Sequence, residues 1–181
     1  MGSSAMGEPD RQQRAAADEQ GADPVRVVLE TPLGCIYVDV DTARAPATAT
    51  HFLRQVDGGR YNGGRFHRAV TPADQSGDAG AGELIQARPN PNRPGDDGPS
   101  PPEPAGQARP AHQEGTVALA GGATADVVIY LGDQLAPGDG VTPFGQVVDG
   151  LDVARAIQRA AAEGQVLTPP VAILRAARTG R

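Results

Sequence analysis

The sequence predicts a mainly β protein, a closed eight-stranded antiparallel β-barrel capped by two α-helices. Eight short runs rich in β-branched residues alternate with glycine- and proline-containing turns, and two further segments have helical spacing. The 181 residues, 39% of them hydrophobic, suffice for one buried core. A sheet of so many short strands cannot hide its edges in a domain this small, so closure into a barrel is the economical arrangement.

The chain divides into an N-terminal arm and one domain. Residues 1–24 are polar and Ala-rich and open with a stretch typical of an expression tag, so we expect them to be disordered. Residues 25–178 are assigned to the barrel domain. Within it, residues 88–113 are so dense in proline that neither a helix nor a strand can run through them. We expect this stretch to be an irregular surface excursion.

The first two strands are predicted over residues 26–31 and 35–40, joined by the Pro-Leu-Gly turn at 32–34. Alternation in the second strand indicates a half-buried hairpin whose inward side chains are Ile36, Val38 and Val40. Cys35 has no Cys-x-x-Cys partner, so we expect it to be a small buried hydrophobe rather than a nucleophile.

A helix is expected from Pro46, because proline is tolerated at a first helical position, to the glycine pair at 58–59. Its apolar side chains recur every three to four residues, at Ala49, Phe52, Leu53 and Val56. After a turn at Asn62-Gly63-Gly64, two more strands are predicted at 65–70 and around 84–86.

Three strands follow the proline-rich stretch, at 116–120, 126–131 and 144–148. Asp152 is placed as the N-cap of a second helix that ends at Gly164. Its predicted apolar face consists of Val153, Ala156, Ile157 and Ala160. A last strand is expected over residues 171–175.

Composition excludes several classes of function. The net charge of −6, scattered basic residues and 3% aromatics argue against a nucleic-acid partner. No apolar stretch approaches the roughly 20 residues that cross a bilayer, so we expect a soluble, cytoplasmic monomer without membrane contact. No cofactor is indicated, and no metal, since none of the histidines at 51, 67 and 112 has ligand spacing. The use of arginine alone as basic residue suggests a bacterial source.

Several motifs then follow one another in a fixed order between about Val25 and Arg178. They are residues 45–52, Tyr61-Asn62-Gly63, Phe66-His67-Arg68, residues 114–120, residues 144–153 and residues 169–173. In order and spacing they resemble the cyclophilin-type peptidyl-prolyl cis-trans isomerases, in a divergent bacterial form. The resemblance implies the cyclophilin barrel and a groove on its face that binds a proline-containing peptide or a small-molecule ligand.

The resemblance also assigns the site residues. Rotation about an X-Pro bond meets a barrier of roughly 18–20 kcal/mol and needs no metal, nucleophile or general base. Arg68 matches the family's catalytic arginine, which donates to the prolyl nitrogen, and Gln86 matches the glutamine that binds the substrate backbone. The other substrate-binding candidates are Leu84, Ala120, Val128 and Phe66, although for Phe66, as for His67, packing in the core is the interpretation that we favour.

Departures from the family pattern indicate reduced activity. Val127 and Val128 stand where the family has a Phe-Phe pair, Glu83 stands at an apolar position, and residues 135–143 hold neither Trp nor His. Loss of an aromatic wall removes tens of Å² of apolar contact, which weakens proline capture by about 1–3 kcal/mol. Turnover is expected to fall roughly tenfold to a hundredfold.

Two alternatives stay open. The barrel is either repurposed as a small-molecule (natural-product) biosynthetic enzyme or cyclase, or it is a non-catalytic binding module whose proline-rich excursion contacts a partner.

Overall fold

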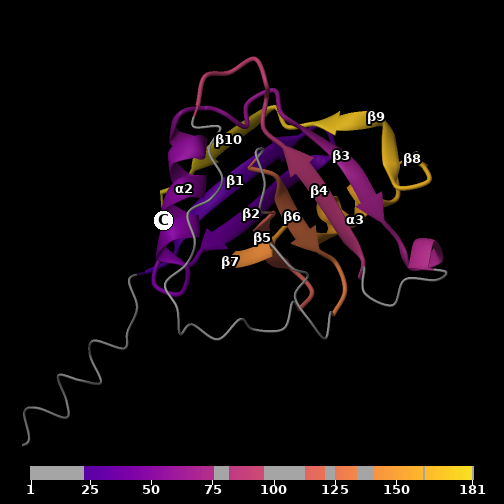
Figure 1. Ribbon diagram of the computed structural model, residues 1–181, viewed down its shortest axis with the longest axis horizontal. Helices are drawn as coiled ribbons and strands as arrows, with labels where there is room; N and C mark the ends of the chain where they lie inside the picture. The colour runs from indigo at the N-terminus through magenta and orange to yellow at the C-terminus, as the bar shows by residue number, and fades with distance from the viewer. Residues whose placement is uncertain are drawn as a thin grey trace, which may run out of the picture.

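The computed structural model describes residues 23–75, 82–95, 113–120, 125–133, 141–160 and 162–180. Outside these ranges lie the N-terminal arm up to residue 22 and residues 96–112 of the proline-rich excursion, which include His112. Residues 89–95 of the excursion are described and form neither helix nor strand. The elements are β1 (Val25–Thr31), β2 (Gly34–Val40), α2 (Pro46–Asp57), β3 (Arg65–Val70), the 3-10 turn η1 (Pro72–Gln75), β4 (Leu84–Arg88), β5 (Thr116–Ala120), β6 (Val127–Tyr130), β7 (Val141–Asp149), α3 (Leu151–Gln158), β8 (Ala162–Glu163), β9 (Val166–Ala172) and β10 (Arg175–Arg178) (Figure 1).

The strands form one antiparallel sheet in the order β10-β1-β2-β7-β5-β6-β4-β3-β9-β8. The strands β9 and β10 are separated by two residues only, yet β9 pairs with β3 and β10 pairs with β1, near opposite ends of this order. The Ile173 amide donates to the Gly64 carbonyl and the Leu174 amide donates to the Glu30 carbonyl, both at 2.8 Å. The two ends of the sheet therefore meet along this segment.

The mainly β, antiparallel architecture with two α-helices confirms the predicted fold class among the described residues, but the strand count differs. Eight strands were expected and ten are described. The predicted last strand is in fact two, because the chain turns at Ile173–Leu174 to leave β3 and join β1. The other addition is the two-residue strand β8, which is too short to produce a periodic pattern.

The hairpin of β1 and β2 shows how alternation fills the core. Ile36, Val38 and Val40 are at most 1% exposed, as predicted. The expectation that Cys35 is buried is wrong, because its side chain is exposed. Successive side chains on a strand point to opposite faces, so the parity that buries Ile36 turns Cys35 outward.

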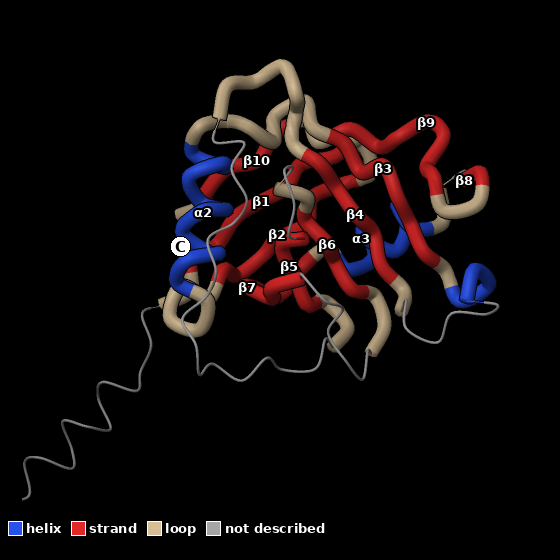
Figure 2. Tube along the Cα trace, in the orientation of Figure 1, coloured by secondary structure: helices blue, strands red, loops and turns tan. Residues whose placement is uncertain are grey.

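Helix α2 begins with Pro46 and buries the four predicted apolar side chains, Ala49, Phe52, Leu53 and Val56. The ring of Phe52 lies 4.7 Å from that of Phe144 on β7 and 5.4 Å from that of Tyr61. The helix lies at one margin of the strands, near β10 (Figure 2). This is the capping position expected for it.

Helix α3 differs from its prediction at both ends. It starts at Leu151 after Gly150, whose φ of 83° suits glycine, so Asp152 lies in the first turn and is not the N-cap. It ends at Gln158 rather than at Gly164. Its buried residues are Ala154, Ile157 and Gln158. Of the predicted apolar face, Ile157 is buried, Val153 and Ala160 are partly buried against the core, and Ala156 is only partly buried and lies outside the core cluster. No helix in the described ranges is long and apolar enough to span a membrane.

Candidate functional site

Strand register brings five side chains into one row on the outer face of the sheet. Arg68 on β3 lies opposite Gln86 on β4 and opposite Val166 on β9. Gln86 lies opposite Val128 on β6, which in turn lies opposite Ala118 on β5. Directly paired residues of antiparallel strands share a face, so the row mixes one cation, one amide and three apolar side chains.

Two members of this row, Val128 and Ala118, belong to a hydrophobic cluster separate from the barrel core, here called the outer cluster. It consists of Val70, Leu84, Ala118, Val128 and Tyr130, with Ala120 and Val141 partly buried at its edge. The two predicted wall residues Leu84 and Val128 are only 8% and 4% exposed, so they form a floor. The accessible predicted residues are those around it, namely Arg68, Gln86 and Ala120.

Two glutamines hold the guanidinium of Arg68. Its Nε and Nη2 donate to Oε1 of Gln165 at 3.0 and 2.7 Å, and its Nη1 donates to Oε1 of Gln86 at 3.4 Å. Both partners are neutral amides. The positive charge of Arg68 is therefore held in place without a carboxylate partner among the described residues.

Asp126 fixes the amide of Gln86. Nε2 of Gln86 donates to Oδ2 of Asp126 at 2.9 Å. A carboxylate only accepts hydrogen bonds, so the NH₂ of Gln86 turns toward Asp126 and its carbonyl oxygen turns toward Arg68. The Asp126 side chain is 5% exposed, and Arg88 and His67 each place a nitrogen 3.7 Å from Oδ2. Asp126 thereby fixes the orientation of the Gln86 amide at the site.

The structure corrects two assignments at the Phe-His-Arg motif. Phe66 is fully buried in the barrel core, so it cannot contact a ligand on the outer face, whereas its predicted packing role is confirmed. His67 is not a core residue. It lies where the register of β3 shifts against both neighbouring strands, and its side chain is 21% exposed, with Nε2 3.2 Å from the Arg88 guanidinium. Partial burial, and then the charge of Arg88, lower the pKa of His67.

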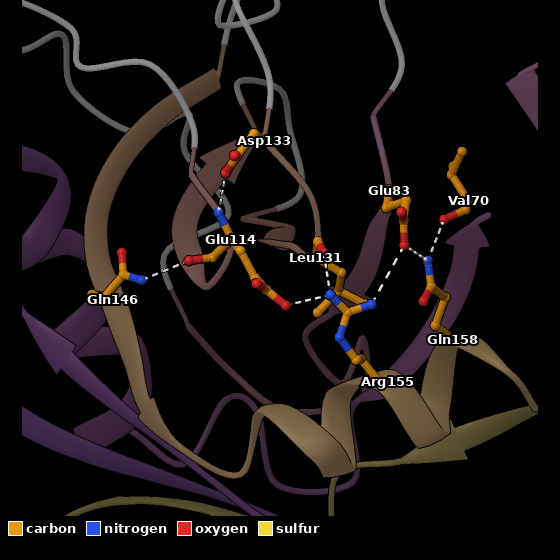
Figure 3. Close-up of polar contacts among 8 residues, drawn as sticks. All are labelled: Val70, Glu83, Glu114, Leu131, Asp133, Gln146, Arg155 and Gln158. Atoms are coloured by element: carbon orange, nitrogen blue, oxygen red, sulfur yellow. Dashed lines mark hydrogen bonds and ion pairs between the residues drawn. The ribbon is translucent and has the colours of Figure 1, made fainter. Parts of the chain in front are cut away.

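Glu83 occupies a position where an apolar residue was expected, and α3 supplies its partners. Arg155 lies between Glu83 and Glu114, with Nη1 3.5 Å from Oε2 of Glu83, and it also bonds the Leu131 carbonyl at 2.7 Å (Figure 3). Gln158 donates to Glu83 at 3.2 Å and to the carbonyl of Val70 at 2.8 Å. This network ties the ends of β3 and β6 and the start of β4 to the helix.

Sequence reasoning missed three contributors to the site, namely Asp126, Tyr130 and Gln165. The first two carry a readable signal, because they lie two positions before and after Val128 and so share its face. Gln165 carries none, since it meets Arg68 across 97 residues of sequence.

Within the described ranges, no group of three or more His, Cys, Asp or Glu side chains is arranged to hold a metal ion. The loop at 135–143, whose sequence holds neither Trp nor His, is described only from residue 141 onward.

Comparisons with known proteins bear on the family and the fold. Residues 26–178 match the family model described as cyclophilin type peptidyl-prolyl cis-trans isomerase/CLD. The fold is similar to that of a cyclophilin type peptidyl-prolyl cis-trans isomerase from Cryptosporidium parvum, whose crystal structure was determined in the presence of the dipeptide Ala-Pro. The TM-score is 0.67 at 13% identity, and the match covers 86% of this chain and 99% of that one. A second crystal structure of that protein gives a TM-score of 0.67 at 14% identity, covering 87% and 99%.

Proposed function

Since the chain belongs to the cyclophilin-type peptidyl-prolyl cis-trans isomerase family, we propose that it isomerises X-Pro bonds on the outer face of the barrel, with Arg68 as its catalytic residue. The observation that supports this most is the guanidinium of Arg68, which is held by neutral amides beside an apolar floor. Because the crystal structure of the Cryptosporidium relative was determined with Ala-Pro, we propose a proline-containing peptide as the ligand.

The chemistry follows from what twisting does to an amide. In the planar ground state the prolyl nitrogen shares its lone pair with the carbonyl, and in the twisted state that pair is localised on nitrogen. An N–H of Arg68 directed at this nitrogen binds the twisted state more strongly than either planar isomer, which lowers the barrier. Gln86 is proposed to bind the backbone of the peptide.

The small apolar surface that this floor offers to a proline ring supports a reduced rate of isomerisation. Leu84, Val128 and Tyr130 are each under 9% exposed, so a proline ring meets a shallow aliphatic and phenolic surface. An apolar contact smaller by tens of Å² weakens capture by about 1–3 kcal/mol at roughly 25 cal/mol per Å². We expect this loss to appear in kcat/KM, and therefore as slower turnover when the peptide concentration is below KM, because the ring carbons contact the floor in the planar and the twisted states alike.

The test is a protease-coupled isomerisation assay on an Ala-Pro-Phe peptide with wild type and Arg68→Ala. We expect the wild type to accelerate isomerisation and Arg68→Ala to lower kcat/KM by about a hundredfold, as for loss of one preorganised transition-state donor. Arg65→Ala is the matched control, since Arg65 is an exposed arginine on the same strand. It should retain wild-type activity.

Equal rates for wild type and Arg68→Ala would exclude the proposed mechanism. A wild type without any acceleration would instead favour a repurposed small-molecule enzyme or a binding module.

A further inference from the structure

A turn far away in sequence reaches the catalytic residue. The hairpin of β8 and β9 turns at Gly164, whose φ of 63° suits glycine, and Gln165 follows directly. The carbonyl of Gln165 accepts a hydrogen bond from the amide of Ala69 at 2.9 Å. The turn is therefore anchored to the residue next to Arg68, and the side chain of Gln165 lies within reach of the guanidinium.

The contact uses one edge of the guanidinium. Oε1 of Gln165 accepts from both Nε and Nη2 of Arg68, at 3.0 and 2.7 Å, whereas Nη1 makes only a long bond of 3.4 Å to Gln86. Guanidinium N–H groups are coplanar and point in fixed directions. Holding the Nε and Nη2 edge therefore sets the plane of the group and leaves donors on the Nη1 side for a ligand.

We infer that Gln165 is a positioning residue, which orients the guanidinium of Arg68 toward the ligand on the outer face. The inference rests on the proposed function. A long arginine side chain loses rotamer entropy when it binds the transition state. A partner that already holds the side chain in one rotamer removes this entropic contribution from the activation free energy. A neutral amide does so without neutralising the charge that the reaction uses.

The experiment compares Gln165→Met, which keeps the length but removes the acceptor, with Gln165→Glu, which keeps an acceptor. Glu163→Gln, an exposed change in the same hairpin, is the control. Two properties are measured, namely kcat and KM for the proline peptide and the Nε–Hε resonance of Arg68 in ¹⁵N-correlated NMR spectra. The resonance is identified by its absence in Arg68→Lys.

In Gln165→Met we expect faster exchange of the Arg68 Nε–H with water and a kcat lower by roughly tenfold, at nearly unchanged KM, as for loss of a hydrogen bond to a charged group. Gln165→Glu should restore the protected resonance, and Glu163→Gln should resemble wild type. An unchanged resonance or an unchanged kcat in Gln165→Met would overturn the inference. Inactive wild type would overturn the proposed function alone, because the resonance reports the contact without turnover.

Discussion

At the scale of single residues, the site contains charged side chains that lie next to one another and are partly shielded from solvent, and those around His67 change its ionisation. His67 lies between the Arg88 guanidinium and the Asp126 carboxylate, with Arg65 also near. Burial and then the charge of Arg88 lower the pKa of His67, and the Asp126 carboxylate opposes them to a smaller extent. The histidine is therefore harder to protonate in the folded protein than in the unfolded chain.

This difference predicts a pH dependence of stability. Because the unfolded chain binds the proton first, the free energy of unfolding should fall as the pH drops below the ordinary His pKa of 6.5 and level off below the lowered folded pKa. Urea unfolding between pH 7 and pH 5 measures it. In His67→Gln this part of the decline should be absent. A variant with the same decline as wild type would show that other groups cause it.

At the scale of elements, the polar network between α3 and the strands replaces an apolar contact at Glu83. Arg155 and Glu83 are 34% and 25% exposed at the side chain, so solvent screens their attraction in part. We expect Arg155→Met, which keeps the aliphatic stem, to lower the free energy of unfolding by about 1 kcal/mol. A double-mutant cycle with Glu83→Gln should give a coupling of about 0.5 kcal/mol.

Arg175→Met provides the comparison for Arg155→Met. Arg175 lies 3.8 Å from Glu30, but the two side chains are 64% and 38% exposed, so its loss should change stability little. Equal losses in the two variants would mean that the network around Arg155 adds nothing beyond an ordinary surface pair.

Elements also show what sequence alone can predict. Period-two alternation placed Ile36 inside the barrel and is enough to place Leu84 and Val128 on one outer face. It cannot reveal that Glu83 finds Arg155 on α3, or that Gln165 finds Arg68, because those contacts join elements that only the complete fold brings together. The family motif likewise offered Phe66 as a ligand contact. Phe66 and Arg68 have the same parity on β3, and only the register shift between them places Phe66 in the core and Arg68 on the outer face.

At the scale of the whole molecule, the barrel closes where the two ends of the sheet meet, along residues 173–174, and this junction is here called the seam. Residues 62–64, which the sequence marks as a turn, hold the seam. Gly63 donates to the Ile173 carbonyl at 2.8 Å, and Oδ1 of Asn62 accepts from the amide of Ala176 on β10 at 2.8 Å. The small size of the domain predicted that the sheet closes into a barrel. Which residues close it becomes clear only from the structure, in which β9 pairs with β3 and β10 pairs with β1.

Asn62→Ala should therefore loosen the seam. It removes the acceptor of the Ala176 amide, and leaving a half-buried donor unpaired costs about 1–3 kcal/mol, or a Tm lower by roughly 2–4 °C per kcal/mol for a domain of this size. Asn62→Asp keeps an oxygen at this position and should retain most of the stability. Amide hydrogen exchange separates a local from a global effect: opening confined to the seam speeds exchange at Ala176 and its β10 neighbours, whereas general destabilisation also speeds β5 and β6. Wild-type exchange at Ala176 in Asn62→Ala would show that the backbone pairing of β1 with β10 closes the barrel unaided.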